Sequence, residues 1–295
     1  MLKYNKIINL LNDKEKSRNL IPTNDIIAWE KYPKYNWIYN KLELCKFSNI
    51  KSAPMPVEPT NYPVIIKPIT NLYGMGLNIK KINSKEEFYE NWFSNNFWME
   101  FFEGEHLSYD IIILKGSIKF YTCFLGHKDT KKLGKFLCWE SVQRNLPKNA
   151  KKLINKYFKN YSGCINIETL DNNIIECHLR IGDSYIFSSD DLLNGIVATY
   201  RKQKYNWNII LPNIYLFPVW SGKIVVDQKV YNYLNKKITK YLLNNKYVVE
   251  FDIDKPDLSS PCDEKRLLKF SCIDYNKGVK IVKHIQKILE EKFSS

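Results

Sequence analysis

Short apolar runs interrupted by turn residues recur along the chain and predict many strands. Residues 61–82 hold a β-branched run, Val64-Ile65-Ile66, followed by a turn at Gly74-Met75-Gly76 and a second apolar stretch. This spacing predicts strand, turn, strand. Residues 96–125 predict two more strands, joined by a hairpin turn at Lys115-Gly116. A basic loop is expected over residues 126–136.

Helical periodicity alternates with these strands. Ser84 precedes Glu87 by three residues, which is a capping box, and Phe88 and Trp92 then share one helical face. Further helices are expected at 1–19, 147–161, 190–203, 228–243 and from about residue 277. Strands are expected between these helices, and a loop at 256–261. The pattern therefore indicates an α+β fold with many antiparallel strands, and not a regular βαβ repeat.

A third hairpin carries unusual chemistry. Residues 164–170 and 173–181 read as two strands joined by Asp171-Asn172-Asn173. Strand alternation places Asn166 and Glu168 on one face. A turn centred on Asn172 sets them opposite the partner strand's polar residues, pairing Asn166 with His178 and Glu168 with Glu176. Arg180 lies on the same face.

Two facing glutamates repel each other unless a cation lies between them, so this hairpin suits Mg²⁺ together with phosphate oxygens. The alternative is a polar sheet face turned to solvent. Against that alternative, the opposite face already supplies core residues, namely Ile165, Ile167, Ile175 and Leu179.

Composition and charge add little. Hydrophobic residues make up 44% and charged residues 26% of the 295 residues, which is typical of a globular protein. The net charge of +14 favours an anionic partner, but an AT-rich codon usage would produce the same lysines. The basic residues are dispersed and no nucleic-acid-binding motif occurs, which argues against nucleic acid as partner.

The cysteines and apolar runs bear on location. Seven cysteines without a C-x-x-C pattern argue against a zinc module or a disulfide framework. The longest apolar runs, such as residues 111–114, are too short to span a bilayer. We therefore expect a cytoplasmic protein in a reducing compartment, with no membrane contact.

Well-known catalytic motifs are missing. The patterns G-x-x-x-x-G-K-[ST], G-x-G-x-x-G, H-E-x-x-H and G-x-S-x-G do not occur. Lys67, at the end of a buried strand and close to the glycine turn, suits a polyphosphate, although a surface lysine would read the same way. The apolar strand before Gly104 could present backbone groups to an adenine, although a plain core strand fits equally well.

Taken in order, these segments resemble the ATP-grasp superfamily, over about residues 36–200. The resemblance rests on Asn40-Lys41, on residues 63–68 with the glycine turn, on the 99–104 hinge, and on Glu176-x-His178-x-Arg180. It implies two α+β lobes that close on a nucleotide. The implied domains are a short N-terminal segment (1–60), a small lobe with the hinge (61–110), a large lobe with the metal hairpin (111–205) and an extra C-terminal α/β subdomain (206–295).

The resemblance also implies roles for single residues. Lys41 and Lys67 would bind phosphates, the backbones of Glu100 and Phe102 would bind adenine, and Glu105 or His106 would lie near the ribose. Gly74, Met75 and Gly76 would form the loop that closes over the phosphates. Glu168 and Glu176 would hold Mg²⁺ or Mn²⁺, with Asn166 and His178 at further ligand positions. Arg180 and Arg144 would act with Lys67 on the transferring phosphoryl group.

Two positions depart from the family pattern. His178 stands where the family usually has Asn, and an imidazole suits Mg²⁺ less well than an oxygen ligand. Counting forward from Gly163 places the first carboxylate position on Asn166, whereas cross-strand pairing places it on Glu168.

The resemblance implies an ATP- and Mg²⁺-dependent carboxylate–amine or carboxylate–thiol ligase that works through an acylphosphate. Alternatives are a small-molecule kinase of the same fold and a degenerate nucleotide-binding scaffold. Lysines of the 126–136 loop, Lys128, Lys131, Lys132 and Lys135, suit an acidic small-molecule substrate, although an ordinary solvated loop has the same composition. The substrate and the oligomeric state stay open.

Overall fold

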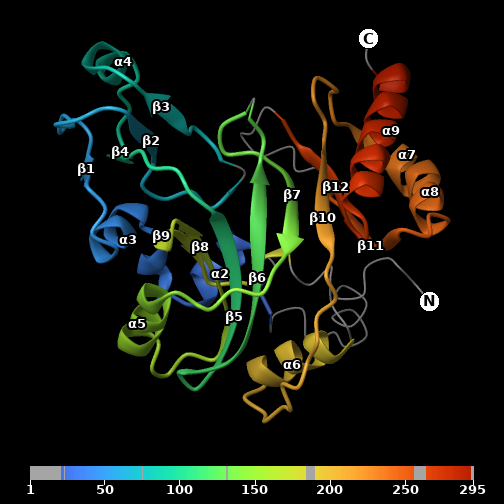
Figure 1. Ribbon diagram of the computed structural model, residues 1–295, viewed down its shortest axis with the longest axis horizontal. Coiled ribbons are helices and arrows are strands. Elements are labelled where there is room, and N and C mark those ends of the chain that lie inside the picture. Colours follow the sequence, from blue (N-terminus) through green and yellow to red (C-terminus); the bar gives the residue numbers. More distant parts are fainter. Residues whose placement is uncertain are drawn as a thin grey trace.

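The computed structural model describes residues 21–22, 24–74, 76–130, 132–183, 190–255 and 264–293. Within these ranges the strands form two sheets, and every strand pairing is antiparallel. Figure 1 shows the smaller sheet beside the helix α4 and the larger one running through the centre of the molecule. The α+β prediction is confirmed.

The smaller sheet has four strands in the order β1-β4-β2-β3. Their bounds are Ser52–Pro54 (β1), Val64–Pro68 (β2), Lys80–Ile82 (β3) and Asn96–Glu100 (β4). The pairing of β2 with β3 confirms the predicted strand–turn–strand unit. β1 was not predicted, because a three-residue strand containing a proline carries almost no periodic signal.

The larger sheet has eight strands in the order β11-β12-β10-β7-β6-β5-β8-β9. Their bounds are His106–Leu114 (β5), Ser117–Lys128 (β6), Phe136–Ser141 (β7), Gly163–Leu170 (β8), Asn173–His178 (β9), Tyr215–Trp220 (β10), Val248–Ile253 (β11) and Arg266–Cys272 (β12). The C-terminal strands β10–β12 therefore extend the same sheet. The expected 126–136 loop is shorter, since β6 and β7 each take residues from it.

Two tight turns set the register of the larger sheet. Lys115 and Gly116 have φ of 50° and 78°, and Asp171 and Asn172 have φ of 47° and 64°. Two consecutive residues with positive φ are characteristic of the hairpin turn whose twist matches the flanking strands. Both hairpins were predicted from these residues, and both are confirmed.

The helices surround the two sheets. Their bounds are Asp25–Lys31 (α2), Lys41–Phe47 (α3), Lys85–Glu90 (α4), Lys148–Tyr157 (α5), Asp190–Tyr200 (α6), Gln228–Tyr233 (α7), Thr239–Leu243 (α8) and Tyr275–Phe293 (α9), with a 3₁₀ turn at Asn36–Tyr39. A π-helical turn at Leu234–Ile238 joins α7 to α8, so the predicted helix over 228–243 is confirmed. The expected helix at 1–19 and the loop at 256–261 lie outside the described residues.

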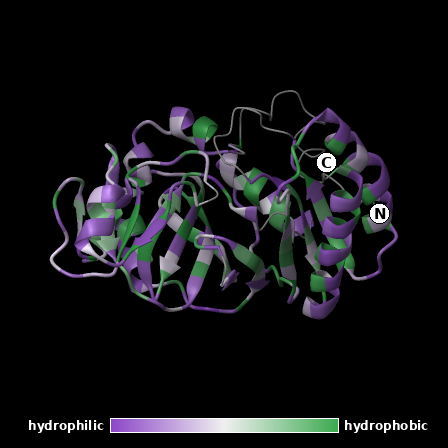
Figure 2. Ribbon diagram, turned by 90° about the horizontal axis from the view of Figure 1, so that it is seen from above, coloured by the Kyte–Doolittle hydropathy of each residue, from purple (hydrophilic) through white to green (hydrophobic). Residues whose placement is uncertain are grey.

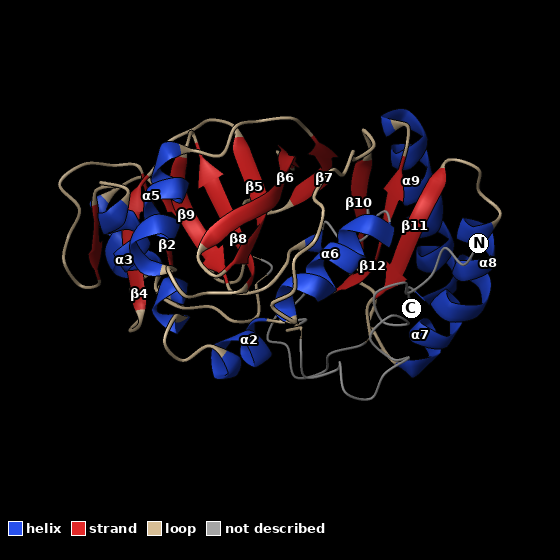
Figure 3. Cartoon of the chain, turned by 90° about the horizontal axis from the view of Figure 1, so that it is seen from below, coloured by secondary structure: helices blue, strands red, loops and turns tan. Residues whose placement is uncertain are grey.

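Strand alternation divides the large lobe into a core face and a site face. On β5, Tyr109, Ile111 and Ile113 pack in one cluster with residues of α2 and α5. Ile112 points to the opposite face and packs against α6, which lies in front of the sheet in Figure 3. A separate core joins β10–β12 to α7–α9. In Figure 2 hydrophobic and hydrophilic bands alternate along these helices, as expected when one face is buried.

Helix α4 is shorter than its sequence pattern suggests. Ser84 caps it by accepting a 3.3 Å hydrogen bond from the Glu87 N–H, while the Glu87 carboxylate accepts from the Asn83 N–H at 2.8 Å. The helix then ends at Glu90. Phe88 is fully buried, but Trp92 lies beyond the end of the helix and is 47% exposed, so the expectation that the two share one helical face was wrong.

The described helices and cysteines bear on two further expectations. Over the ranges given above, none of the helices combines the length and apolarity that a bilayer crossing requires. The six cysteines found there are buried and unbridged, and Cys262 lies outside the described residues.

The contrast between Phe88 and Trp92 gives a matched stability test. We expect Phe88→Ala to lower the free energy of unfolding by about 3–5 kcal/mol, because it empties a closed core site. Trp92→Ala should cost less than about 1 kcal/mol, since the ring is half exposed. Urea unfolding followed by circular dichroism measures both. Equal losses would show that Trp92 belongs to the core.

Candidate active site

A large cavity is lined by residues of both sheets, including the C-terminal strands β10–β12 of the larger one. Its volume is about 1000 Å³, and residues of β2, β4, β5, β8, β9 and β10–β12 line it. Small-molecule sites fall mostly between about 300 and 1000 Å³. The cavity therefore has room for a nucleotide and a second substrate.

Two buried lysines enter this cavity from separate elements. Asn40 caps α3 by accepting from the Glu43 N–H, which places Lys41 in the first turn of the helix. The Lys41 ammonium lies 2.9 Å from a Glu176 oxygen. Lys67, on β2 of the small sheet, donates at 3.3 Å to the carbonyl of Ile175. Both lysines thus converge on β9, although 26 positions separate them in the chain.

The two ammonium groups are close enough to perturb each other. Burial lowers the pKa of Lys67, and the positive charge of Lys41 lowers it further. Lys41 and Lys67 are only 4% and 5% exposed. Two buried cations that face one cavity form a site in which a bound anion relieves repulsion.

The glycine turn lies over the same end of the cavity. Gly74 and Gly76 both have positive φ, and both line the cavity; Met75 lies outside the described residues. Asn71 shapes the turn, since its amide donates to the Gly74 carbonyl at 2.9 Å and accepts from the Tyr73 N–H. A Cβ at Gly76 would lie 3.1 Å from the Gly134 carbonyl oxygen. The turn therefore approaches the β6–β7 loop closely.

The hinge between the lobes lines the next part of the cavity. Glu100 ends β4, where it pairs with Val64, and Phe102 and His106 follow along the cavity wall. The Phe101 N–H still donates to the Pro63 carbonyl. Beyond that bond the chain leaves the small sheet, so the backbone of Phe102 is available to a ligand edge.

The carboxylates of the β8–β9 hairpin lie opposite each other, as the sequence predicts. Glu168 pairs with Glu176, and Asn166 with His178, in the predicted register. One oxygen of Glu168 lies 2.9 Å from His106 Nε2. Burial alone would raise the pKa of Glu176, but the charges of Lys41 and the neighbouring cations outweigh it and lower that pKa to about 2. Glu176 is therefore ionised at neutral pH.

These carboxylates supply only some of the ligands that a metal ion needs. No group of three or more His, Cys, Asp or Glu side chains in the described ranges is arranged to enclose an ion. Mg²⁺ is commonly bound by one or two carboxylates together with substrate phosphates and waters. Glu168 and Glu176 fit that arrangement, with phosphate oxygens completing the ligand set.

Asn166 is engaged elsewhere. It is 3% exposed, and its amide donates at 2.9 Å to Ser108 Oγ and at 2.9 Å to an Asp110 oxygen. Both bonds use the amide N–H groups, whereas a metal ion would be bound by the side-chain oxygen. These contacts orient Asn166, and its role as a metal ligand beside Glu168 stays a prediction.

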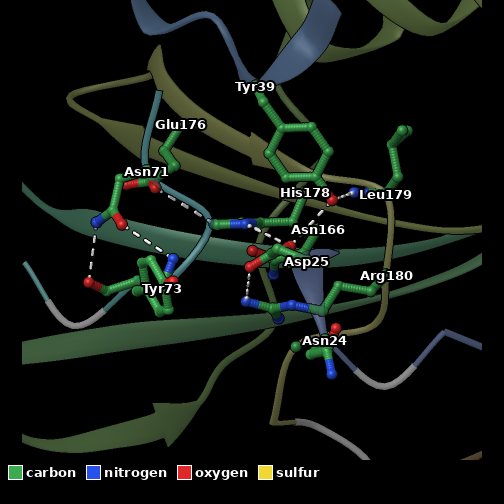
Figure 4. Close-up of polar contacts among 12 residues, drawn as sticks. Asn24, Asp25, Tyr39, Asn71, Tyr73, Asn166, Glu176, His178, Leu179 and Arg180 are labelled. Atoms are coloured by element: carbon green, nitrogen blue, oxygen red, sulfur yellow. Dashed lines mark hydrogen bonds and ion pairs between the residues drawn. The ribbon is translucent and has the colours of Figure 1, made fainter. Parts of the chain in front are cut away.

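An aspartate that the sequence analysis missed holds the far end of the hairpin. Figure 4 shows Asp25 of α2 between Tyr39, His178 and Arg180. Its oxygens lie 3.0 Å from His178 Nδ1 and 2.8 Å from Arg180 Nη2, and one of them accepts from the Tyr39 hydroxyl at 3.0 Å. His178 Nε2 lies 3.6 Å from Glu176. Asp25 therefore fixes the orientation of both cationic side chains.

This cluster shifts the protonation of its members. Burial would raise the pKa of Asp25, but the charges of His178 and Arg180 outweigh it and hold the pKa well below its usual range. Burial would lower the pKa of His178, yet the facing Asp25 raises it overall. The sequence contains a signal for the helix, because Asn24 is a cap residue, but none for a partner 153 positions away.

Arg144 and Glu105 do not join the cavity. Arg144 Nη2 lies 3.2 Å from Glu105 Oε1, and both side chains are about half exposed. Neither is among the described residues that line the cavity. The two side chains form a half-exposed ion pair, whereas His106 lines the cavity. A role of Arg144 at the transferring phosphoryl group, or of Glu105 near the ribose, stays a prediction that this geometry does not favour.

The C-terminal strands supply a charged wall that sequence reasoning did not assign. Arg266 and Lys269 of β12 each lie 2.7 Å from an oxygen of Asp183. These three residues line the cavity, as do Asp252 and Asp254. Since residues 206–295 carry no resemblance to a known motif, only the topology reveals this wall.

The Asp25 cluster predicts a pH-dependent loss of stability. Because the pKa of Asp25 is lower in the folded state, its stabilisation is complete above the ordinary pKa of about 4 and is lost as pH falls through the folded value. Asp25→Asn should therefore cost about 3–5 kcal/mol at pH 7 and progressively less below about pH 4. Glu43→Gln, which removes only an exposed ion pair with Lys46, should cost less than about 1 kcal/mol.

Denaturant unfolding across pH measures this difference. A loss for Asp25→Asn that is small at pH 7, or that stays constant down to pH 2.5, would contradict the assigned ion pairs.

No family model and no curated protein matches the sequence. Among solved structures, the chain is similar to an L-amino acid ligase from Bacillus licheniformis, with 8% identity, TM-score 0.56, and 96% of this chain and 84% of that chain covered. It is also similar to carboxyaminoimidazole ribonucleotide synthase from Aspergillus clavatus complexed with ATP, with 12% identity and a TM-score of 0.62 over 89% of this chain and 75% of that chain. A third similar structure is N5-carboxyaminoimidazole synthetase from Staphylococcus aureus, with 13% identity and a TM-score of 0.58 over 97% of this chain and 83% of that chain.

These similarities extend over most of both chains, while the identities are too low to carry a function. They show that the chain has the ATP-grasp fold.

Proposed function

We propose that this protein is an ATP-dependent carboxylate–amine ligase. One observation carries the proposal: Lys41, paired with Glu176, and Lys67, bonded to the Ile175 carbonyl, line the same large cavity as the facing carboxylates Glu168 and Glu176. Buried cations next to ionised carboxylates suit a metal-bound triphosphate, because the cations can bind phosphate oxygens and the carboxylates can bind the metal ion. The ligases of the same fold, one of them complexed with ATP, support this choice.

The nucleotide would lie between the lobes. The hinge backbone at Glu100 and Phe102 would bind adenine, with His106 near the ribose. Lys41 and Lys67 would bind phosphate oxygens, and the Gly74–Gly76 turn lies at the same end of the cavity, where backbone N–H groups can approach phosphates. Glu168 and Glu176 would hold Mg²⁺, which when bound neutralises phosphate charge.

The reaction would proceed in two balanced steps. The γ-phosphoryl group passes from ATP to a substrate carboxylate oxygen, which yields ADP and an acylphosphate. An amine then attacks the acyl carbon, so that a C–N bond forms, the C–O bond to phosphate breaks, and phosphate and one proton leave. Arg180, fixed by Asp25, would stabilise the negative charge of the transferring group.

The lysine assignment predicts a selective loss of nucleotide binding. We expect Lys67→Met to weaken ATP binding at least about 10- to 100-fold, because it removes a buried charge-assisted contact. Arg144→Met, at the surface ion pair, should leave the Kd unchanged. Isothermal titration with ATP and Mg²⁺ measures both. Equal affinity of Lys67→Met and the parent protein would refute the phosphate site. Absence of ATP binding by the parent protein would instead favour a degenerate scaffold.

The carboxylate assignment predicts a loss of metal dependence. In Glu176→Gln, we expect Mg²⁺ to strengthen ATP binding little or not at all, and ADP release to fall at least about 100-fold. Glu105→Gln is the matched surface control. The comparison requires ATP titrations with and without Mg²⁺. An undiminished effect of Mg²⁺ in Glu176→Gln would place the metal elsewhere. Products tell ligase from kinase, since a ligase releases phosphate and a kinase retains it in a phosphoester.

A further inference from the structure

Helix α5 carries a strongly basic surface at the edge of the large lobe (Figure 1). Five exposed lysines and Asn155 line a shallow surface depression there. Their spacing of three or four residues places them on one face of the helix, and Lys159 follows just after its last residue, Tyr157. None of these described residues lines the cavity. The five, called the α5 lysines below, are Lys148, Lys151, Lys152, Lys156 and Lys159.

The charge of the α5 lysines is not neutralised within the part of the chain that the structure describes. Residues 141–167 contain no Asp or Glu. The ion pairs of the described residues all involve other side chains. Helix α3 approaches where Lys152 Nζ lies 5.9 Å from the centre of the Phe47 ring, but its Lys46 and Glu43 pair with each other at 2.7 Å. The surface therefore keeps five positive charges.

This arrangement is unfavourable for the helix itself. Lys148, Lys152 and Lys156 follow one another at intervals of four residues, and like charges at this spacing destabilise a helix. The first turn contains no acidic residue, although the N-terminus of a helix favours negative charge. Natural sequences break such local rules mainly at functional sites. A bound anion would relieve the repulsion between these lysines.

The buried side of α5 argues against a lipid surface as that anion. A helix that lies on a membrane buries its apolar face between the lipids. In α5 the apolar residues Ala150, Leu153 and Ile154 are fully buried in the core of the large lobe. The fold thus already uses the apolar face that a membrane would need.

The side chains of the exposed face favour a nucleic acid over a protein. Protein–protein interfaces are depleted in lysine, whereas lysines neutralise the phosphates of nucleic acids whatever the base sequence. Tyr157 is 38% exposed at the end of α5, and its ring lies 4.8 Å from that of Trp37. Basic residues beside an exposed aromatic ring are typical of proteins that bind single strands, because bases stack on the ring.

We propose that the α5 surface binds a single-stranded nucleic acid, a function separate from ligation. The α5 lysines bind its phosphates, and Tyr157 stacks on a base. The 10 residues of the helix span about 15 Å, which is enough for a few nucleotides. The basic residues of the whole chain are dispersed, but α5 gathers these five on one surface.

Fluorescence anisotropy with a fluorescein-labelled oligothymidylate of 20 nucleotides tests the proposal. The full chain is titrated at about 50 mM and about 200 mM salt. The test variant combines Lys148→Gln, Lys152→Gln and Lys156→Gln. Circular dichroism checks its fold, and titration with Mg²⁺ and ATP checks its active site, which should be unchanged.

Helix α9 offers a matched control. Lys280, Lys283 and Lys287 are exposed on α9 at the same kind of spacing. Changing all three to Gln removes the same net charge as the test variant does. The control therefore separates a site on α5 from a general response to net charge.

We expect the parent protein to bind the oligonucleotide with a steep salt dependence. If all five lysines contact phosphates, the slope of log K against log salt is about −3.5, since each contact contributes about 0.7. The test variant should reduce this slope by about 2 and weaken binding at least about tenfold at low salt. The α9 control should keep the slope and the affinity of the parent protein.

Several results would overturn the assignment. Absence of binding by the parent protein at low salt is one, and an equal loss in the α5 and α9 variants is another. Binding of a polyglutamate peptide as tight as that of the oligonucleotide would indicate an acidic protein instead. Tighter binding to phosphatidylserine vesicles would indicate a membrane, and tighter binding to a duplex of the same length would exclude stacking on Tyr157. None of these outcomes bears on ATP binding.

Discussion

The register of the β8–β9 hairpin is the constraint on which the rest of the site depends. Asp171 and Asn172 form its turn, both with positive φ, and this turn sets Glu168 opposite Glu176. A slip of one residue would move every polar side chain of the hairpin to the core face. Lys41 and Lys67 reach the hairpin from other elements. Their contacts with Glu176 and with the Ile175 carbonyl therefore exist only in this register.

The negative charge of Glu176 offsets part of the positive charge of both buried lysines. A buried ammonium without a partner is costly, and two of them near each other are costlier still. Glu176 compensates Lys41 directly, and the pKa of Lys67 falls because compensation is incomplete. The protein thus holds a site whose electrostatic free energy improves when a polyanion enters.

Local sequence signals predicted the parts of the fold that depend on neighbours in the chain. Positive-φ turn residues gave both hairpins, and strand alternation gave the cross-strand pairs of Glu168 and Asn166. Asp25 could not be predicted, because its partners His178 and Arg180 lie more than 150 positions away. Arg144 is the converse case: a motif position suggested a role at the phosphoryl group, whereas in the structure its side chain pairs with Glu105 at the surface, so that role stays a prediction.

The charged wall of the C-terminal strands could not be predicted from the sequence for a related reason. Arg266 and Lys269 read as ordinary charges on a strand until β12 is placed in the large sheet next to β10. Only then do they meet Asp183. A fold assembled from antiparallel neighbours brings distant segments together through pairing order, which composition and periodicity do not encode.

The central claim is that Lys41 and Lys67 bind the phosphates of a nucleotide opposite Glu168 and Glu176. A crystal structure of the protein grown with Mg²⁺ and β,γ-imido-ATP tests it most directly. We expect phosphate oxygens within hydrogen-bond distance of both ammonium groups, and the adenine against the backbone of Glu100–Phe102. A nucleotide bound outside the cavity, or bound in it with both lysines still turned to Glu176 and Ile175 and away from the phosphates, would contradict the account.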